Sequence, residues 1–190
     1  MELYETMQSD KIHLTLRGND MRFTIREARL EDAKRLVEIY SYYVENTAVS
    51  FEYKVPTVEE FERRIETIKK KYPYLVCEDE GKVVGYAYAD MYGVREAFNW
   101  SATTSIYIDK DYRRRGIGSL LYDALEKAAK ERGIVNLFAV VAYVDKEDEN
   151  LSKDSSKFHT QYGYEEVGRM KSIGKKFDKW YDLIYYQKRL

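Results

Sequence analysis

Hydrophobic and polar residues alternate along the chain with a period that changes between two and about 3.6, which predicts strands interspersed with helices. Strands are predicted over residues 22–28, 74–78, 82–90, 98–108, 137–142, 165–173 and 180–187. Helices are predicted over residues 30–44, 57–71, about 117–132 and 153–161. This order, with hairpins over residues 74–90 and 165–187, predicts a mixed sheet flanked by helices in one domain.

Local signals mark several element ends. Thr57 and Glu60 have the spacing of a capping box at a helix start, and Pro73 closes that helix. Gly81 is expected to supply a positive φ in the hairpin turn at residues 79–81. The almost continuous apolar run at residues 137–142 predicts a central strand buried on both faces.

The first twenty residues are set apart from the domain, which we place at residues 21–190. Ile12, Leu14 and Leu16 alternate with polar residues and are compatible with an additional edge strand. A flexible or dispensable arm is equally compatible with this segment.

Composition excludes several classes. The 32 basic and 33 acidic side chains of the 190 residues nearly cancel, so no global field attracts nucleic acid or a membrane. A mean hydropathy of −0.63, without a long apolar run or a secretory leader, predicts a cytoplasmic protein. The single cysteine, Cys77, is expected to be a buried thiol, and no metal site is expected because the two histidines are far apart.

A basic, glycine-containing turn connects the predicted strand at 98–108 to the next helix. It contains Arg113, Arg114, Arg115, Gly116 and Gly118. Glycines let backbone N–H groups approach a ligand, a helix N-terminus favours anions, and arginines pair with phosphate. The segment lacks the residues of a P-loop or a G-x-G-x-x-G motif. It predicts a pyrophosphate site.

The turn is one of five collinear motifs, found at residues 46–51, 99–102, 113–118, 155–164 and 174–182. As an ordered set, they resemble the GNAT N-acetyltransferases, in particular the phosphinothricin-acetyltransferase-like branch, over residues 21–187. The resemblance implies an α/β (α+β) fold with a mostly antiparallel mixed sheet, acetyl-CoA as the cofactor, a small-molecule amine as the acceptor and a homodimer. The near-zero net charge predicts no nucleic-acid or membrane partner. Because no basic stripe accompanies the 19 tyrosines, they are expected to pack or to contact another subunit rather than to stack on bases.

The resemblance also implies roles for individual residues. The cofactor-binding residues are Ile106, Tyr107, Ile108, Arg113, Arg114, Arg115, Gly116, Ile117, Gly118, Ser119, Ser155 and Phe158. The acceptor-binding residues are Phe51, Glu52, Trp100, Lys176, Trp180 and Asp182. The catalytic residues are His159, Thr103 and Tyr107.

The implied reaction is direct attack of an amine on a thioester, which needs a base for the ammonium proton and favours an acid for the thiolate. His159 stands where many relatives have a tyrosine proposed as the acid; alternatively it packs the last helix. Thr103 stands where this branch has its presumed glutamate base, and threonine cannot ionise near neutral pH. Another carboxylate such as Glu52, or a water chain held by Thr103 and Tyr107, could replace the base.

Two further explanations of Thr103 remain. The acceptor amine arrives neutral, or the protein is a catalytically weak acetyl-CoA-binding sensor or interaction protein. Glu52 also departs from the branch, whose phosphinothricin-specific members have arginine there. A glutamate repels an anionic acceptor and favours a cationic or amino-acid-like amine; alternatively it is a solvated loop charge.

Overall fold

The computed structural model describes residues 3–8, 11–16 and 23–190. They form two compact units. The first contains the described residues up to Ile39 together with Pro56–Asp90 and Ser105–Gly133. The second contains Tyr40–Val55, Met91–Thr104 and Ile134–Leu190, so that helix α1 (Ala33–Asn46) and strand β6 (Ser101–Ile108) contribute residues to both.

The strands of the first unit follow one another in space in chain order. They are β1 (Leu3–Gln8), β2 (Lys11–Leu16), β3 (Phe23–Glu27), β4 (Tyr74–Asp79), β5 (Lys82–Met91) and the last residues of β6. Consecutive strands from β1 to β5 pair antiparallel. The predicted strand near residue 12 is therefore present as β2, but it lies between β1 and β3 rather than at the edge. Residues 17–20 of the predicted arm lie outside the described residues.

The helical segments of the first unit are η1 (Leu30–Asp32), the start of α1, α2 (Val58–Lys69), η3 (Lys110–Tyr112) and α3 (Ile117–Glu131). The Thr57 side chain accepts a hydrogen bond from the Glu60 N–H at 3.2 Å, which confirms the predicted N-cap. Helix α2 ends at Lys69, two residues before the predicted end. In the β4–β5 turn Gly81 has the predicted positive φ, and Glu80 before it also has a positive φ. The turn therefore has two residues in the left-handed region, where one was predicted.

Helices α2 and α3 cover opposite faces of β5. Neighbouring residues of a strand point to opposite faces. The Phe61 ring of α2 lies 6.4 Å from the Tyr86 ring, whereas Ile117 of α3 packs against the adjacent Gly85. Tyr86 also stacks with Tyr74, and both are 1% exposed, so these tyrosines belong to the core.

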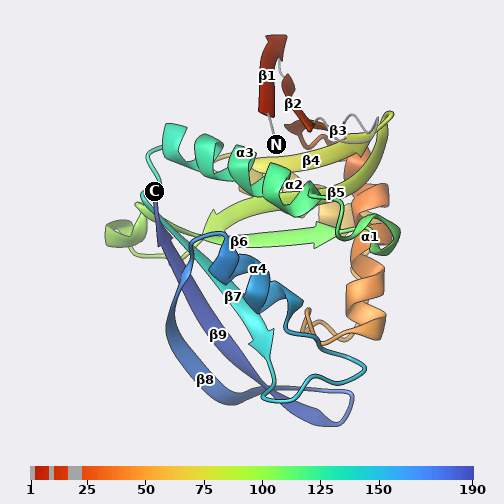
Figure 1. Cartoon of the computed structure of the whole chain (residues 1–190), viewed down its shortest axis with the longest axis vertical. Coiled ribbons are helices and arrows are strands. Elements are labelled where there is room, and N and C mark those ends of the chain that lie inside the picture. The colour runs from red at the N-terminus through yellow and green to blue at the C-terminus, as the bar shows by residue number, and fades with distance from the viewer. Residues whose placement is uncertain (1–2, 9–10, 17–22) are drawn as a thin grey trace. The chain divides into compact units, whose positions relative to one another are not determined.

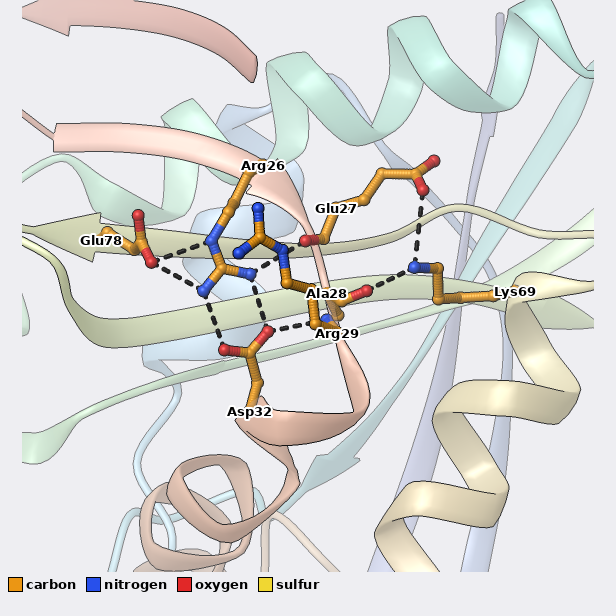
Figure 2. Close-up of polar contacts among 7 residues, drawn as sticks. All are labelled: Arg26, Glu27, Ala28, Arg29, Asp32, Lys69 and Glu78. Carbon is orange, nitrogen blue, oxygen red and sulfur yellow. Dashed lines mark hydrogen bonds and ion pairs between the residues drawn. The ribbon is translucent and has the colours of Figure 1, made fainter. Parts of the chain in front are cut away.

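A buried ion cluster ties β3 to β4 and to η1, which directly precedes α1 (Figure 2). The Arg26 guanidinium donates to both Asp32 oxygens at 2.7 and 2.8 Å and to Glu78 Oε1 at 2.8 and 2.6 Å. Burial opposes ionisation of Asp32, but the hydrogen bonds from Arg26 and from the Arg29 N–H outweigh it and lower the Asp32 pKa. The cluster therefore depends on every charge being present.

The second unit contains the first residues of β6, together with β7 (Asn136–Tyr143), β9 (Lys179–Arg189) and β8 (Glu165–Lys176) in that spatial order. Strands β6 and β7 are parallel, whereas β7–β9 and β8–β9 are antiparallel. The β8–β9 hairpin is the long blue ribbon in Figure 1, and both strands extend beyond the predicted ends. The remaining helical segments are η2 (Glu96–Phe98) and α4 (Asp154–Gln161).

Two predictions for this unit are wrong. Residues 98–100 are not part of the strand, because Phe98 ends a 3-10 turn and β6 begins at Ser101. Strand β7 is not buried on both faces, since Val140 is 38% exposed and Phe138 is half-buried. An apolar run alone does not distinguish a central strand from one with a partly open face.

The predicted mixed, mostly antiparallel α/β architecture is confirmed. Cys77 is fully buried, as predicted, and burial raises the pKa of its thiol to about 12. Within residues 3–8, 11–16 and 23–190, no helix is both long and apolar enough to cross a membrane.

Candidate active site

The predicted site residues are divided between the two units. The first unit holds the arginine turn and Ile106, Tyr107 and Ile108 at the end of β6. The second unit holds Thr103, Trp100, the loop after α1, helix α4 and the β8–β9 hairpin.

Asp109 anchors the start of the arginine turn. Its N–H donates to the Val84 carbonyl of β5 at 2.9 Å, and its carboxylate accepts from the Asp111 N–H at 3.0 Å. Arg35 of α1 also pairs with this carboxylate. Burial opposes ionisation of Asp109, but the Asp111 N–H and Arg35 outweigh it and lower the pKa of Asp109. The turn is thus held at its base by β5 and α1.

The arginine turn leads into an uncapped helix N-terminus. Gly116 is the N-cap of α3 with a φ of 81°, and it has no side chain to occupy the first N–H groups of the helix. Arg113, Arg114 and Arg115 are exposed, as is Ser119, and the Arg115 guanidinium lies 4.7 Å from the centre of the Tyr112 ring. A helix N-terminus beside three arginines has the donors and the charge that a pyrophosphate requires.

Ile117 and Gly85 bring the turn close to the sheet. Ile117 is 1% exposed, so it packs inward, while Gly118 is half-buried. A Cβ on Gly85 would lie 3.2 Å from the Tyr107 carbonyl oxygen and 3.3 Å from Ile117 Cγ2. Gly85 was missed in the sequence, although an isolated glycine inside a strand of β-branched and aromatic residues signals a close backbone approach.

Ile106, Tyr107 and Ile108 are half-buried at the end of β6. The Tyr107 ring packs 5.3 Å from the Tyr86 ring. Through Tyr107, the end of β6 packs against the aromatic core of the first unit just before the arginine turn.

In the second unit, residues 47–53 follow α1; we call this segment the acceptor loop because it contains Phe51 and Glu52, which the resemblance predicts to contact the acceptor. Ser50 holds it from within, because its Oγ lies 2.7 Å from the Tyr40 hydroxyl and accepts from the Glu52 N–H at 3.1 Å. The Ala48 N–H donates to the Asn150 carbonyl at 2.9 Å. Phe51 and Glu52 are half-buried in this fixed loop.

The acceptor loop also contacts the β8–β9 hairpin. Lys176 is 4% exposed, and its Nζ donates to the carbonyls of Thr47 at 2.9 Å and Ser50 at 2.6 Å. The Phe51 ring packs against Gly174, and its centre lies 6.3 Å from that of the Tyr181 ring. The structure therefore brings the predicted acceptor residues Phe51, Glu52 and Lys176 together.

Trp100 and Trp180 remain largely exposed, at 61% and 60%. The Trp100 carbonyl accepts from the N–H groups of Val135 and Asn136, so its backbone is fixed while its indole faces solvent. Trp180 pairs with Lys175 across the hairpin. Both indoles are available as apolar contact surfaces.

Asp182 is engaged in holding the hairpin. Its carboxylate accepts from Arg169 Nε at 2.6 Å and from the Ser172 N–H at 2.7 Å. Ser172 has a φ of 50° within the irregular pairing between Met170 and Gly174. Burial opposes ionisation of Asp182, but these partners outweigh it and lower the pKa of Asp182. This geometry favours a structural role, and Arg169 was missed because nothing local marks it as the partner.

His159 is buried in α4, at 3% exposure. Its Nδ1 lies 2.7 Å from the Ser155 carbonyl of the preceding turn, and its ring stacks on Tyr186. Burial lowers the pKa of His159 to about 4, against the hydrogen bond with Ser155, which raises it. A neutral imidazole that donates through Nδ1 has no second proton, which favours packing over acid catalysis. Ser155 and Phe158 on the same helix are half-buried.

Thr103 is half-buried in β6, opposite Phe138 of β7. The neighbouring Thr104 is buried and donates to the Phe138 carbonyl at 3.4 Å. Thr103 therefore lies on the more open face of β6, where a hydroxyl can orient a water molecule but cannot ionise. Among the residues whose placement is described, no group of three or more His, Cys, Asp and Glu side chains could hold a metal ion.

Comparison with known proteins gives the class of protein that this fold and turn define. The profile described as "Acetyltransferase (GNAT) domain" matches residues 25–185, so the chain belongs to the GNAT acetyltransferases. It is an acetyl-CoA-dependent N-acetyltransferase, in agreement with the donor set of the arginine turn.

Three relatives illustrate the branch. Phosphinothricin N-acetyltransferase of Streptomyces viridochromogenes is 31% identical over 165 residues, which cover 86% of each chain. L-methionine sulfoximine/L-methionine sulfone acetyltransferase of Pseudomonas aeruginosa is 29% identical over 172 residues, covering 90% of this chain and 96% of that protein. The crystal structure of a phosphinothricin acetyltransferase from Sinorhizobium meliloti in complex with acetyl-CoA is 31% identical, covers 88% of each chain and has a TM-score of 0.80.

Proposed function

We propose that the protein acetylates the α-amine of a free amino acid whose side chain is uncharged or cationic. The names of the relatives support an amino acid, since they include phosphinothricin, methionine sulfoximine and L-amino acid acyltransferases. The observation that carries the side-chain assignment is Glu52, a half-buried carboxylate in the fixed acceptor loop. At an effective dielectric near 20, a like charge within about 6–10 Å costs roughly 1–3 kcal/mol, and the buried Lys176 ammonium, whose pKa the charge of Glu52 raises, offsets part of this cost. Phosphinothricin, with its anionic side chain, is therefore a poor acceptor.

The cofactor supplies an activated acetyl thioester. We assign its pyrophosphate to Arg113, Arg115 and the N–H groups of residues 116–119, with Arg114 adding charge. Residues 106–108 are assigned to the acetyl-pantetheine arm, and a backbone N–H in this part of β6 polarises the thioester carbonyl. Ser155 and Phe158 of α4 complete the cofactor contacts.

Phe51, Trp100 and Trp180 are assigned to the apolar part of the acceptor. The amine nitrogen attacks the thioester carbon, a C–N bond forms, and the C–S bond breaks with its electron pair going to sulfur. The amine proton passes to bulk solvent along a chain of water molecules held by Thr103 and Tyr107. Thr103 supports this assignment because its hydroxyl lies on the more open face of β6.

The departing thiolate needs no side-chain acid in this proposal. A thiol has a pKa near 8–9, so its anion leaves without prior protonation and then takes a proton from water. His159 is assigned to packing α4 against β9, which its burial and its stacking on Tyr186 support.

The second candidate is a catalytically weak acetyl-CoA-binding protein of the same fold, acting as a sensor. Thr103 is the observation that favours it, because a missing general base costs about 10²–10⁴-fold in rate. The two candidates differ in turnover and agree on cofactor binding.

A homodimer is also proposed. It is supported by exposed apolar side chains on the β8–β9 hairpin, namely Val167, Met170, Ile173 and Trp180, each about half exposed. Light scattering coupled to size exclusion tests it, and a monomer at micromolar concentration refutes it.

The decisive experiment combines calorimetric titration with acetyl-CoA and thiol release over a panel of acceptors. The panel contains L-methionine sulfone, L-lysine and phosphinothricin. We expect acetyl-CoA to bind. We also expect kcat/KM for L-methionine sulfone to be at least about 5-fold higher than kcat/KM for phosphinothricin. Glu52→Gln should narrow this ratio and Glu52→Arg should invert it. Binding without turnover would favour the sensor, and an unchanged ratio in both variants would remove Glu52 from acceptor selection.

A further inference from the structure

The acceptor loop is attached to the β8–β9 hairpin at three consecutive hairpin residues. Gly174 receives the Phe51 ring, the Lys175 carbonyl accepts from the Tyr53 hydroxyl, and Lys176 donates to two loop carbonyls. The loop and the hairpin residues are more than 120 positions apart in the chain, as the separation of 126 between Lys176 and Ser50 shows. The hairpin therefore determines the path of a loop to which it is not adjacent in sequence.

Lys176 differs from the other two attachments because it is a buried cation. Its side chain is 4% exposed, and within the described part of the chain its ammonium donates to two neutral backbone carbonyls, those of Thr47 and Ser50. Burying an ammonium is unfavourable unless it is hydrogen-bonded, and charge-assisted bonds are the stronger kind. Burial lowers the Lys176 pKa, and the charge of Glu52 opposes this by raising it.

Both acceptors of Lys176 are main-chain atoms, so its hydrogen bonds fix the backbone of the loop rather than one side chain. Ser50 is held a second time, because its Oγ lies 2.7 Å from the Tyr40 hydroxyl in the core. Phe51 and Glu52 follow Ser50 directly, and the Glu52 N–H donates to the same Ser50 Oγ. A shift at Ser50 would therefore move both side chains assigned to the acceptor.

We propose that Lys176 is a positioning residue: it holds the Thr47 and Ser50 carbonyls so that Phe51 and Glu52 stand in the geometry that binds the acceptor. This inference rests on the proposed function for the identity of the acceptor residues. It separates Lys176 from direct substrate contact, because its Nζ is buried and engaged with the loop backbone. Loss of the Lys176 hydrogen bonds should weaken acceptor binding and leave cofactor binding intact.

The test compares Lys176→Met, which keeps an unbranched side chain one atom shorter but removes its charge and donors, with Lys176→Arg, which keeps charge and donors. Lys175→Met is the matched control, since it removes a lysine one residue away that is half exposed and contributes its carbonyl rather than its side chain to the loop. Amide hydrogen exchange of residues 47–53 reports the loop directly, with the bonded Ala48 N–H as the most informative amide. Kinetics report KM and kcat for the acceptor, and calorimetry reports the acetyl-CoA Kd.

For Lys176→Met we expect the amide exchange rates of residues 47–53 and the acceptor KM each to rise about 10–100-fold. This magnitude corresponds to the loss of one to two charge-assisted hydrogen bonds. The acetyl-CoA Kd should stay within about twofold, Lys176→Arg should recover part of the KM, and Lys175→Met should match the parent protein. A raised KM without faster exchange would mean that Lys176 touches the acceptor, which overturns the positioning role. Faster exchange with an unchanged KM, or no change in either, overturns it as well.

Two safeguards keep the outcome decisive. If Lys176→Met does not fold by circular dichroism, Lys176→Arg and Lys176→Gln carry the same comparison. If the parent protein turns over no acceptor in the panel, the acceptor assignment fails, and the positioning role in catalysis falls with it. The exchange rates then still decide separately whether Lys176 holds the loop.

Discussion

Gly174→Ala tests the acceptor loop through a single added methyl group. A Cβ at Gly174 would lie 2.3 Å from Cε2 of the Phe51 ring and 2.7 Å from its Cδ2 and Cζ. Carbon atoms pack at about 3.5–4.0 Å, so the ring must retreat by at least about 1.2 Å. Because Phe51 also packs on the fully buried Tyr181, this retreat displaces the acceptor loop.

The displacement sets the expected magnitude. A shift of about 1 Å in a positioned group can cost about 10²-fold, so the acceptor KM or kcat/KM should worsen by about 10–100-fold. Overpacking costs about 1–3 kcal/mol, which for a domain of this size lowers the melting temperature by roughly 2–10 °C. The Kd for acetyl-CoA should stay within about twofold of that of the parent protein, because cofactor binding is assigned to other residues than Gly174 and Phe51.

The same strand offers the control. A Cβ at Gly168 meets nothing within 4 Å, so Gly168→Ala adds the same methyl group to β8 in open space. Thiol release at varied acceptor concentration, calorimetry with acetyl-CoA and thermal unfolding should be measured on both variants. If Gly174→Ala binds and turns over the acceptor as Gly168→Ala does, Phe51 is not part of the acceptor site. Equal losses of acceptor and cofactor binding would indicate general misfolding instead of loop displacement.

The remaining predictions concern the base, the cofactor and acid stability. At pH values below the pKa of the acceptor amine, Thr103→Glu should raise kcat/KM by about 10²-fold or more, whereas Thr103→Gln should not. Equal pH–rate profiles for Thr103→Glu and the parent protein would contradict a missing base. Arg113→Gln should raise the acetyl-CoA Kd about 10–100-fold in calorimetry, and an unchanged Kd would remove Arg113 from the cofactor site. Arg26→Met should cost about 3–5 kcal/mol in urea unfolding, because it leaves two carboxylates without their cation. The Asp32 pKa is lowered in the folded protein, so the stability it contributes is present above its unfolded value near 4 and is lost as pH falls toward the folded value. In Asp32→Asn the free energy of unfolding should depend less on pH over this range. An equal decline of the unfolding free energy in the variant and the parent protein would refute the contribution of Asp32.

Several elements could be predicted because their causes are local. Hydrophobic period, the Thr57 cap and the strand–turn–helix around the arginines depend on spacings of two to four residues. The motif order along the chain was likewise sufficient to predict the family and its cofactor. The predicted burial of β7 was wrong because the sequence does not show which neighbouring elements cover each face of a strand.

The candidate site was predictable in its residue types more than in its roles. His159, Lys176 and Asp182 all have the chemistry of active-site groups. In the fold, the first donates to the carbonyl of the preceding turn, the second to the acceptor-loop backbone, and the third accepts from Arg169 and the Ser172 N–H. Each engagement occupies part of the hydrogen-bonding capacity that a direct catalytic role would use, which favours a structural role.

The sequence by itself determined most of the strands and helices, the family, the strand–turn–helix that contains the three arginines and the absence of an ionisable group at Thr103. Only the tertiary structure decided which side chains remain available for chemistry. The physical reason is distance along the chain. Lys176 and Thr47 are 129 residues apart, so their hydrogen bond exists only once the hairpin and the loop have folded against one another. Local patterns carry propensity, whereas burial and partnership are set by residues that meet only in three dimensions.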